Sequence, residues 1–503
     1  MEGAFLLEVE GLPARRGDRG LGLAESVGVA SASGDHLKSG QLGIPSVTAS
    51  TVANIGPGID FYFGFGVIAA TAGVAAPLTI LAATVAVALL AFTVAEFTRA
   101  EPSAGSFITY VETGLGARAG VATAVLVVVG YTVAISAVFT LSGGLVAMTL
   151  AQFTAWHPPW GPFTLVLTVG AIWLTARGVK LSTGAVGVAV LVQVLIMLAV
   201  CVLVLVDQRG VLSGIPFSWA HLTGGLAGLS AGFPLALFMF IGWENGPALA
   251  EEARNPRRTI PAALYISVAV AAVLLVLFAY ATVTGFRYDV SSIGRSSIPF
   301  LTVADHYLGR LGVLAWIAGI VSALATLIAG ADAQSRMLFD AGRTGLLPAR
   351  LGQVRPRSGT PVNALLAMTV AGLGIIGVWW LSRLLTGDTG SMNPVGLYAE
   401  CSTMATIVIL FVYFLTMLSL PFFMWRRHRD SFSVLRHVAI PALGSITLIV
   451  PFAELCQPGQ PAPYSTFPYL AVVLAVVAAV TGWLRVRRDP RAGAGEGAES
   501  PAT

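Results

Sequence analysis

Long apolar stretches recur through most of the chain and are separated by short polar segments. The stretches 81–95 and 268–279, for example, contain no charged residue. A helix of about 20 mostly apolar residues crosses the hydrocarbon core of a bilayer. The pattern therefore predicts an all-α membrane protein with about twelve transmembrane helices. The predicted helices cover residues 44–70, 76–97, 118–149, 160–176, 181–206, 227–250, 261–285, 311–340, 363–383, 396–422, 437–454 and 465–485.

The composition excludes an ordinary soluble protein. Of the 503 residues, 56% are hydrophobic and only 11% are charged, and the mean hydropathy is +0.81. A soluble domain carries about 25% charged residues. A chain with so few charges could not cover a water-facing surface, whereas a lipid bilayer suits it as a solvent.

Both ends of the chain are polar and differ from the region between them. Residues 1–40 are rich in glycine and mixed in charge, and residues 486–503 are rich in Gly, Ala, Pro and Glu. The start lacks the basic, apolar and small-residue sequence of a secretory signal peptide. We expect two disordered cytoplasmic tails around a transporter domain at residues 41–485.

The basic residues alternate from one inter-helix segment to the next. If the N-terminus is cytoplasmic, 24 of the 29 Lys and Arg residues fall in the cytoplasmic segments. Only five fall outside: Arg209, Arg287, Arg295, Arg310 and Arg383. The positive-inside rule predicts this distribution for twelve spans with both termini inside the cell, in the plasma or inner membrane.

Several classes of chemistry have no support in the sequence. Cys201, Cys401 and Cys456 are too scattered for a disulfide framework, and we interpret them as small core residues. The chain has no His/Cys cluster with metal-ligand spacing, nucleophile–base pattern or phosphate-binding loop. No basic patch interleaved with aromatic residues suggests nucleic acid. We therefore expect no enzyme, cofactor, metal or nucleic-acid partner.

The first predicted helix is interrupted near its middle. The interruption reads Asn54-Ile55-Gly56-Pro57-Gly58-Ile59-Asp60. Pro57 lacks an amide hydrogen, and its ring clashes with the preceding turn of a helix. Unwound backbone is not stable against lipid, so this segment should line a cavity or be buried in protein.

The sixth predicted helix is interrupted in the same way. Its interruption reads Phe240-Ile241-Gly242-Trp243-Glu244-Asn245-Gly246-Pro247. Two interruptions five helices apart indicate an inverted repeat with a binding site between them. The broken ends expose partial positive and partial negative charge, which suits a zwitterion such as an amino acid. The alternative is a pair of kinks that serve packing alone.

Four stretches together resemble a known family of transporters. They are the run Gly56-Pro57-Gly58-Ile59, the pair Ala95-Glu96 with 102–107 after it, the segment 240–256, and the segment 336–361. They resemble the G-S-G-I, E…P-x-A-G-S, F-x-G-x-[DE]…E-E…N-P-x-R and R…R-D-G-x-x-P…G-T-P signatures of the amino acid–polyamine–organocation permeases. Each motif is short, but four in the same order are specific. The resemblance covers about residues 40–485.

The resemblance implies a leucine-transporter-like fold of two inverted five-helix repeats and two further helices. Here the repeats would be residues 44–206 and 227–422, and the extra helices 437–485. Family members hold the substrate carboxylate with amides of the first helix and the amino group with carbonyls of the sixth. The positions that match are Gly56, Pro57, Gly58 and Ile59, with Phe238, Phe240, Ile241 and Trp243 as lining residues.

The chain departs from the family pattern at three positions. Pro57 replaces a residue with an N–H group, so one donor for a carboxylate is missing. Asp60 stands where the family usually has an aromatic or aliphatic residue, and Gln193 stands where many members have a lysine implicated in proton coupling. The first two changes favour a cationic substrate, or an amine without a carboxylate.

Carboxylates at membrane depth are costly to insert, by about 2.5–3.5 kcal/mol, and are therefore candidates for function. Asp60 either binds the amine of the substrate or another cation, or makes a structural pair. Glu244 is a candidate for a proton-linked or gating role. Asp332 either contacts the first helix as a cation or gating residue, or pairs with Arg336 one turn on.

Other candidates surround these groups. Glu400 is either an extracellular gate or a solvated helix start, and Glu96, near Arg99, is either structural or gating. Four aromatic residues either cover the substrate or only pack between helices, and the indole of one of them could contact an amine through a cation–π interaction. They are Tyr131, Phe238, Phe240 and Trp243.

The function that these features favour is secondary active transport of an amino acid or a related amine, coupled to protons or working by exchange. A polyamine or cationic amine carrier is the alternative within transport. A membrane sensor that binds an amine without moving it is the alternative from another class. The sequence leaves open the substrate, the coupling ion, the direction of transport and the oligomeric state.

Overall fold

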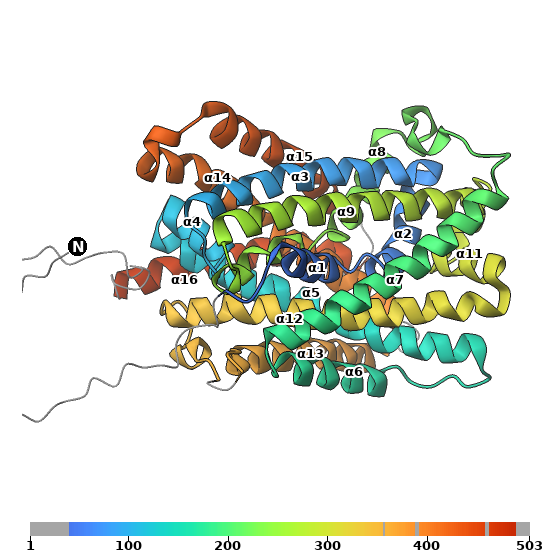
Figure 1. Ribbon diagram of the computed structural model, residues 1–503, viewed down its shortest axis with the longest axis horizontal. Coiled ribbons are helices and arrows are strands. Elements are labelled where there is room, and N and C mark those ends of the chain that lie inside the picture. Colours follow the sequence, from blue (N-terminus) through green and yellow to red (C-terminus); the bar gives the residue numbers. More distant parts are fainter. Residues whose placement is uncertain (1–39, 356–357, 388–391, 458–461, 489–503) are drawn as a thin grey trace, which may run out of the picture. The chain divides into compact units, whose positions relative to one another are not determined.

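The structure is a computed structural model that describes residues 40–355, 358–387, 392–457 and 462–488. Within these ranges the chain forms helices, and the only β-structure is two isolated bridges (Figure 1). The tails expected at 1–40 and 486–503 lie almost wholly outside the described residues. The all-helical prediction is confirmed.

Each of the twelve predicted ranges contains at least one helix. The helices are α1 (Ile44–Ile55), α2 (Ile59–Ala72), α3 (Ala76–Ala100), α4 (Phe107–Leu115), α5 (Ala117–Phe153), α6 (Gly161–Thr175), α7 (Val179–Asp207), α8 (Leu226–Phe238), α9 (Pro256–Gly285), α10 (Val290–Arg295), α11 (Pro299–Leu308), α12 (Val313–Arg343), α13 (Val362–Thr386), α14 (Pro394–Arg427), α15 (Ile440–Leu455) and α16 (Phe467–Arg488). Short 3₁₀ segments η4 (Trp243–Asn245) and η5 (Pro247–Glu252) follow α8.

Nine helical segments of the described chain are long and apolar enough to cross a membrane. The helices differ in how deeply they are buried in protein. In the most apolar window of α5, 78% of the residues are buried, against 22% in that of α16. Many exposed side chains on the outer helices are apolar, such as Val166 and Val378. Such surfaces are stable against lipid but not against water.

The first predicted helix is two helices rather than one. α1 ends at Ile55, where Gly56 adopts the left-handed conformation with φ 63°, and α2 begins at Ile59. Glycine has no Cβ and therefore adopts this conformation without strain. The sixth predicted helix also stops, at Phe238, and the chain continues through Gly242, whose φ is 108°, into η4. The predicted interruptions of both helices are confirmed.

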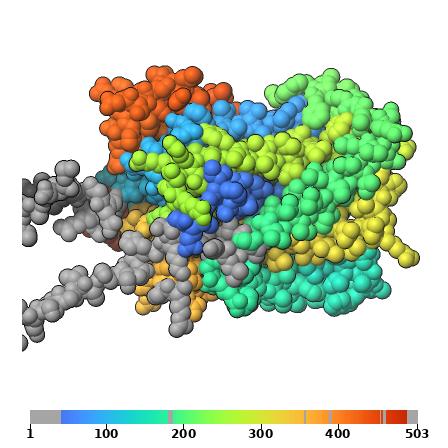
Figure 2. Space-filling view, viewed as in Figure 1, coloured from blue at the N-terminus to red at the C-terminus, as the bar shows by residue number. Residues whose placement is uncertain are grey.

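The two interrupted segments are enclosed by other helices. α1 packs against α7, α9, α12 and η4, and α12 packs also against α5. Figure 1 shows α1 between α9 and α12. On the face drawn in Figure 2, the blue atoms of α1 come to the surface between α9 and α7. Toward its C-terminal end α1 is buried, so the unwound backbone lies inside protein, as stability in a bilayer requires.

Candidate functional site

The first interruption is stabilised by hydroxyl groups of α12. The Ala53 carbonyl at the end of α1 accepts a hydrogen bond from Thr326 Oγ1 at 2.8 Å. The Ile59 N–H at the start of α2 donates to Ser322 Oγ at 3.1 Å. Helix ends have backbone groups without intrahelical partners, and these cannot stay unpaired away from water. α12 therefore bonds a backbone group on each side of the interruption, and the Ala53 carbonyl also accepts from the Gly56 N–H at 3.1 Å.

The second interruption lies directly against the first. The Asn54 side chain donates from Nδ2 to the Gly242 carbonyl at 3.2 Å. A Cβ on Gly242 would lie 2.6 Å from the Asn54 carbonyl oxygen, which is closer than real contacts allow. The sequence therefore needs glycine here for two reasons, the positive φ and the contact. The expectation that the two unwound segments face one another is confirmed.

A cavity lies between these segments, α5 and α12. Its volume is about 30 Å³, enough for a water molecule or two but not for an amino acid. The space as it stands is therefore too small for the substrate of an amino acid transporter. The lining residues are Asn54, Asp60, Tyr131, Ala134, Ile135, Val138, Phe238, Ile241, Gly242, Thr326, Gly330 and Gln334.

Asp60 is the one carboxylate among the lining residues. Only 3% of Asp60 is exposed. Its Oδ1 accepts a hydrogen bond from the Tyr398 hydroxyl of α14 at 3.1 Å. None of the lining residues is a lysine, arginine or histidine. The carboxylate is thus hydrogen-bonded but has no cation beside it in the cavity wall.

Glu244 lies behind the cavity and is fully buried. Its carboxylate accepts from the Tyr131 hydroxyl and, through Oε2, from the Gly242 N–H at 3.0 Å. Tyr131 and Gly242 both line the cavity. Glu244 is therefore connected to the cavity through two of its lining residues, although it does not line the cavity itself.

Comparison with known proteins identifies the family. Residues 42–478 match the amino acid permease family. The chain belongs to this family. The resemblance to the amino acid–polyamine–organocation permeases is thereby confirmed, and the permease is a multi-pass membrane protein of amino acid transport.

The curated relatives of the permease differ in their named substrates. The branched-chain amino acid permease BcaP of Bacillus subtilis is 27% identical over 407 residues, which cover 75% of this chain and 80% of BcaP. The methylthioribose transporter of the same organism is 27% identical, with 64% and 72% covered. The vacuolar cationic amino acid transporter 2 of Arabidopsis thaliana is 28% identical, with 66% and 54% covered.

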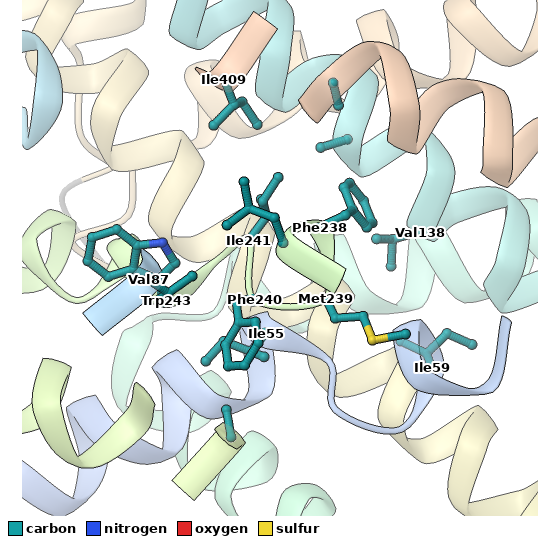
Figure 3. Packing of buried hydrophobic residues seen from close by; sticks show 14 of the residues in the cluster. Ile55, Ile59, Val87, Val138, Phe238, Met239, Phe240, Ile241, Trp243 and Ile409 are labelled. Carbon is teal, nitrogen blue, oxygen red and sulfur yellow. The ribbon is translucent and has the colours of Figure 1, made fainter. Parts of the chain in front are cut away.

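Six of the predicted substrate-site residues of the permease line the cavity: Asn54, Asp60, Tyr131, Phe238, Ile241 and Gly242. The other seven, Ile55, Gly56, Pro57, Gly58, Ile59, Phe240 and Trp243, are buried next to them. Figure 3 shows Phe238 on the side of Val138, with Phe240 beside Ile55 and Trp243 away from both. The Trp243 ring packs instead near Tyr413, with 6.1 Å between the ring centroids.

The remaining predicted carboxylates of the permease form ion pairs. Asp332 Oδ1 lies 3.2 Å from Arg336 Nη1, so the pairing alternative holds. The same guanidinium, which is fully buried, also pairs with Glu252 of η5. Glu400 pairs with Arg383 of α13 and accepts from Trp379 Nε1 at 2.7 Å, so it is not simply a solvated helix start.

Glu96 and Gln193 lie away from the cavity of the permease. Glu96 pairs with Arg99 and lies 3.2 Å from His437 Nε2, which joins α3 to the segment before α15. The His437 Nδ1 accepts from the Ser433 N–H at 2.9 Å, so the Nε2 carries the hydrogen and donates to Glu96. The Gln193 amide is buried without a hydrogen-bond partner among the described residues.

Sequence reasoning missed the contribution of α12 and α14. Thr326, Gly330 and Gln334 are spaced by four residues and line the cavity from one face of α12. This spacing of small and polar residues in an apolar helix is a signal that could have identified them. Tyr398, the partner of Asp60, lies 338 residues from it along the chain, and no local pattern indicates such a contact.

Proposed function

We propose that the permease is a secondary active transporter that moves amino acids or related amines across the cell membrane by alternating access. The observation that carries this proposal is the Asp60 carboxylate, which is buried in a cavity between two interrupted helices with no basic residue in the cavity wall. A carboxylate in that position attracts a cationic group, and interrupted helices are where secondary transporters bind their substrates.

The proposed architecture has twelve spans in two inverted repeats, at residues 44–206 and 227–422, followed by two further helices at 437–485. Support comes from the positions of the two interruptions, each of which lies within the first predicted helix of a repeat. The 24 basic residues on one side of the predicted topology support cytoplasmic termini and a location in the plasma or inner membrane.

In the proposed complex, Asp60 binds the amino group of the substrate. The carboxylate group of an amino acid would lie at the start of α2, where Gly58 offers a backbone N–H group and the helix dipole is positive, while the Ile59 N–H is bonded to Ser322. Pro57 offers no N–H, so this carboxylate site is weaker than one with a complete set of donors. Tyr131 and Phe238 would move to admit the substrate and then cover it.

The proposed coupling site is Glu244. The residue is enclosed, and it contacts the cavity only through Tyr131 and Gly242. A proton gained or lost on Glu244 changes these contacts, and in this way could link protonation to the shape of the cavity. The ion pair of Arg336 with Glu252 and Asp332 connects η5 to α12, and we assign it a gating role.

A carrier of polyamines or other cationic amines is the second candidate. Asp60 favours it because its carboxylate attracts a cation. Pro57 favours it because proline lacks the N–H that would donate to a substrate carboxylate. The names of the relatives, a branched-chain permease and cationic amino acid transporters, instead favour an amino acid as substrate. A sensor without transport is the remaining alternative, and family membership weighs against it.

Uptake into proteoliposomes tests the proposal. We expect purified permease to accumulate a labelled amino acid, and vesicles preloaded with unlabelled substrate to show counterflow. If amines compete with the labelled substrate for uptake and no amino acid does, the result would favour the amine carrier. Saturable binding without counterflow would indicate a sensor and contradict the proposal.

A further inference from the structure

One face of α12 forms a wall of the cavity and carries three residues of different character. Thr326, Gly330 and Gln334 follow one another at intervals of four residues, and all three line the cavity. Residues at this spacing lie above one another on a helix. The wall therefore runs along α12 for two turns, from Thr326 to Gln334.

The first two of these residues are already engaged by the interrupted helices. Thr326 donates to the Ala53 carbonyl. Gly330 leaves room for Asn54, because a Cβ on Gly330 would lie 2.8 Å from Asn54 Oδ1. The Thr326 hydroxyl hydrogen is therefore used inside the protein, and Gly330 has no side chain to bind a substrate.

Gln334 differs from them, because its amide oxygen is unpartnered. Only 5% of Gln334 is exposed, and its Oε1 is buried without a hydrogen bond to any described residue. A buried polar atom without a partner is unfavourable, and native proteins rarely keep one without a reason. In the wall of a binding cavity, a donor on the ligand is the simplest partner.

The charge of the cavity indicates what kind of donor this is. When ionised, Asp60 contributes one negative charge, and the other lining residues contribute no basic group. With a neutral amino acid bound, the cavity would keep a net charge of −1 away from water, which is costly. A basic amino acid carries a net charge of about +1 near neutral pH, and it would cancel the charge of Asp60.

Asp60 and the Gln334 amide lie at different levels of the cavity. A Cβ on Gly56 would lie 2.8 Å from Thr326 Oγ1 and 3.1 Å from Asp60 Oδ2, so Asp60 is level with Thr326. A Cβ on Gly330 would lie 3.9 Å from Gln334 Nε2, so the Gln334 amide is level with Gly330, about one helical turn from Thr326. The two groups can therefore contact different parts of one substrate.

We propose that Gln334 is the residue that selects the side chain of the substrate, and that it favours basic amino acids such as lysine and ornithine. The α-amino group binds Asp60, and the side-chain ammonium donates to Gln334 Oε1. This inference rests on the proposed transport function, since it assigns a substrate class to the same cavity.

The test compares lysine with norleucine, which has a methyl group where lysine has its terminal aminomethyl group. Initial uptake of both is measured in proteoliposomes with wild type, Gln334→Met and Gln334→Glu. Methionine keeps the length and volume of glutamine without an acceptor. We expect wild type to prefer lysine. Gln334→Met should lower kcat/KM for lysine about tenfold or more and leave kcat/KM for norleucine unchanged. Gln334→Glu should retain lysine uptake.

A matched control is Gln152→Met. Gln152 is exposed at the end of α5, outside this cavity, and its side chain donates a hydrogen bond to Asp305. This variant should leave the lysine-to-norleucine ratio unchanged. Equal losses of both substrates in Gln334→Met, or a wild-type preference for norleucine, would overturn this inference while transport itself stands. A wild type that transports neither amino acids nor amines would overturn both this inference and the proposed function.

Discussion

The two helix interruptions differ in the groups that stabilise them and in how each uses its carboxylate. At the first interruption, α12 supplies hydrogen bonds through Ser322 and Thr326, and Asp60 is left at the cavity wall. At the second, the carboxylate is used inside its own segment, because Glu244 accepts from the Gly242 N–H. One carboxylate is thus presented to a ligand and the other is retained by the protein.

The difference separates two tasks that a coupled transporter must perform. A substrate-binding group has to exchange partners in every cycle, which suits Asp60 with its single bond to Tyr398. The protonation of a coupling group has to change the binding site, but the group itself should not bind the substrate. Glu244 contacts the cavity through Tyr131 and Gly242, which suits that task.

The largest expected effect comes from Gly242→Ala. Alanine at φ 108° is strained, and its Cβ would overlap the Asn54 carbonyl oxygen, so the contact between the two interruptions cannot form. We expect loss of folded protein or of all transport, measured by size-exclusion profile and uptake. Gly170→Ala is the matched control, since nothing lies within 4 Å of its Cβ position. Wild-type behaviour of Gly242→Ala would show that the two segments do not depend on each other.

The next largest effect is expected for Asp60→Asn. Removing the charge should weaken substrate binding about ten- to a hundredfold, because hydrogen bonds to charged groups are the strong ones. Binding of labelled substrate to purified protein measures it. Glu400→Gln, which removes a carboxylate paired with Arg383 outside the cavity, should retain binding. Equal binding by wild type and Asp60→Asn would remove the case for an amine site at the first interruption.

How much of the fold and the site could be predicted from the sequence depends on how far apart the interacting residues lie along the chain. Glycine and proline act locally, so both interruptions and the Asp60 and Glu244 positions are apparent from the chain alone. The partner of Asp60 is not, because Tyr398 lies 338 residues away along the chain. The alternatives for Asp332 could be separated only by its geometry with Arg336.

Glu244→Gln sharpens the contrast between the two carboxylates. We expect substrate binding at a fixed pH to stay within about threefold of wild type, because Glu244 does not line the cavity. Net uptake, in contrast, should lose its dependence on pH. Initial rates in proteoliposomes over about pH 5 to 8 measure this. A variant with unchanged pH dependence would end the assignment of Glu244 to coupling.

The smallest effects are expected for Ser322→Ala and Thr326→Val. Each removes one buried hydrogen bond to the first interruption, so each should cost about 1 kcal/mol of stability. Thermal unfolding in detergent should show a slightly lower midpoint for both. Thr369→Val is a control, because Thr369 of α13 bonds only its own helix, at Leu365. If the control is affected as much as these variants, the role of α12 in supporting the interruption is contradicted.

A crystal structure of the permease with bound lysine would show whether Asp60 binds the amine of the substrate. We expect the α-amino group to lie within hydrogen-bond distance of Asp60, with residues 54–60 on one side of the substrate and 238–242 on the other. A substrate bound elsewhere, or bound between these segments without contact to Asp60, would contradict this role of Asp60.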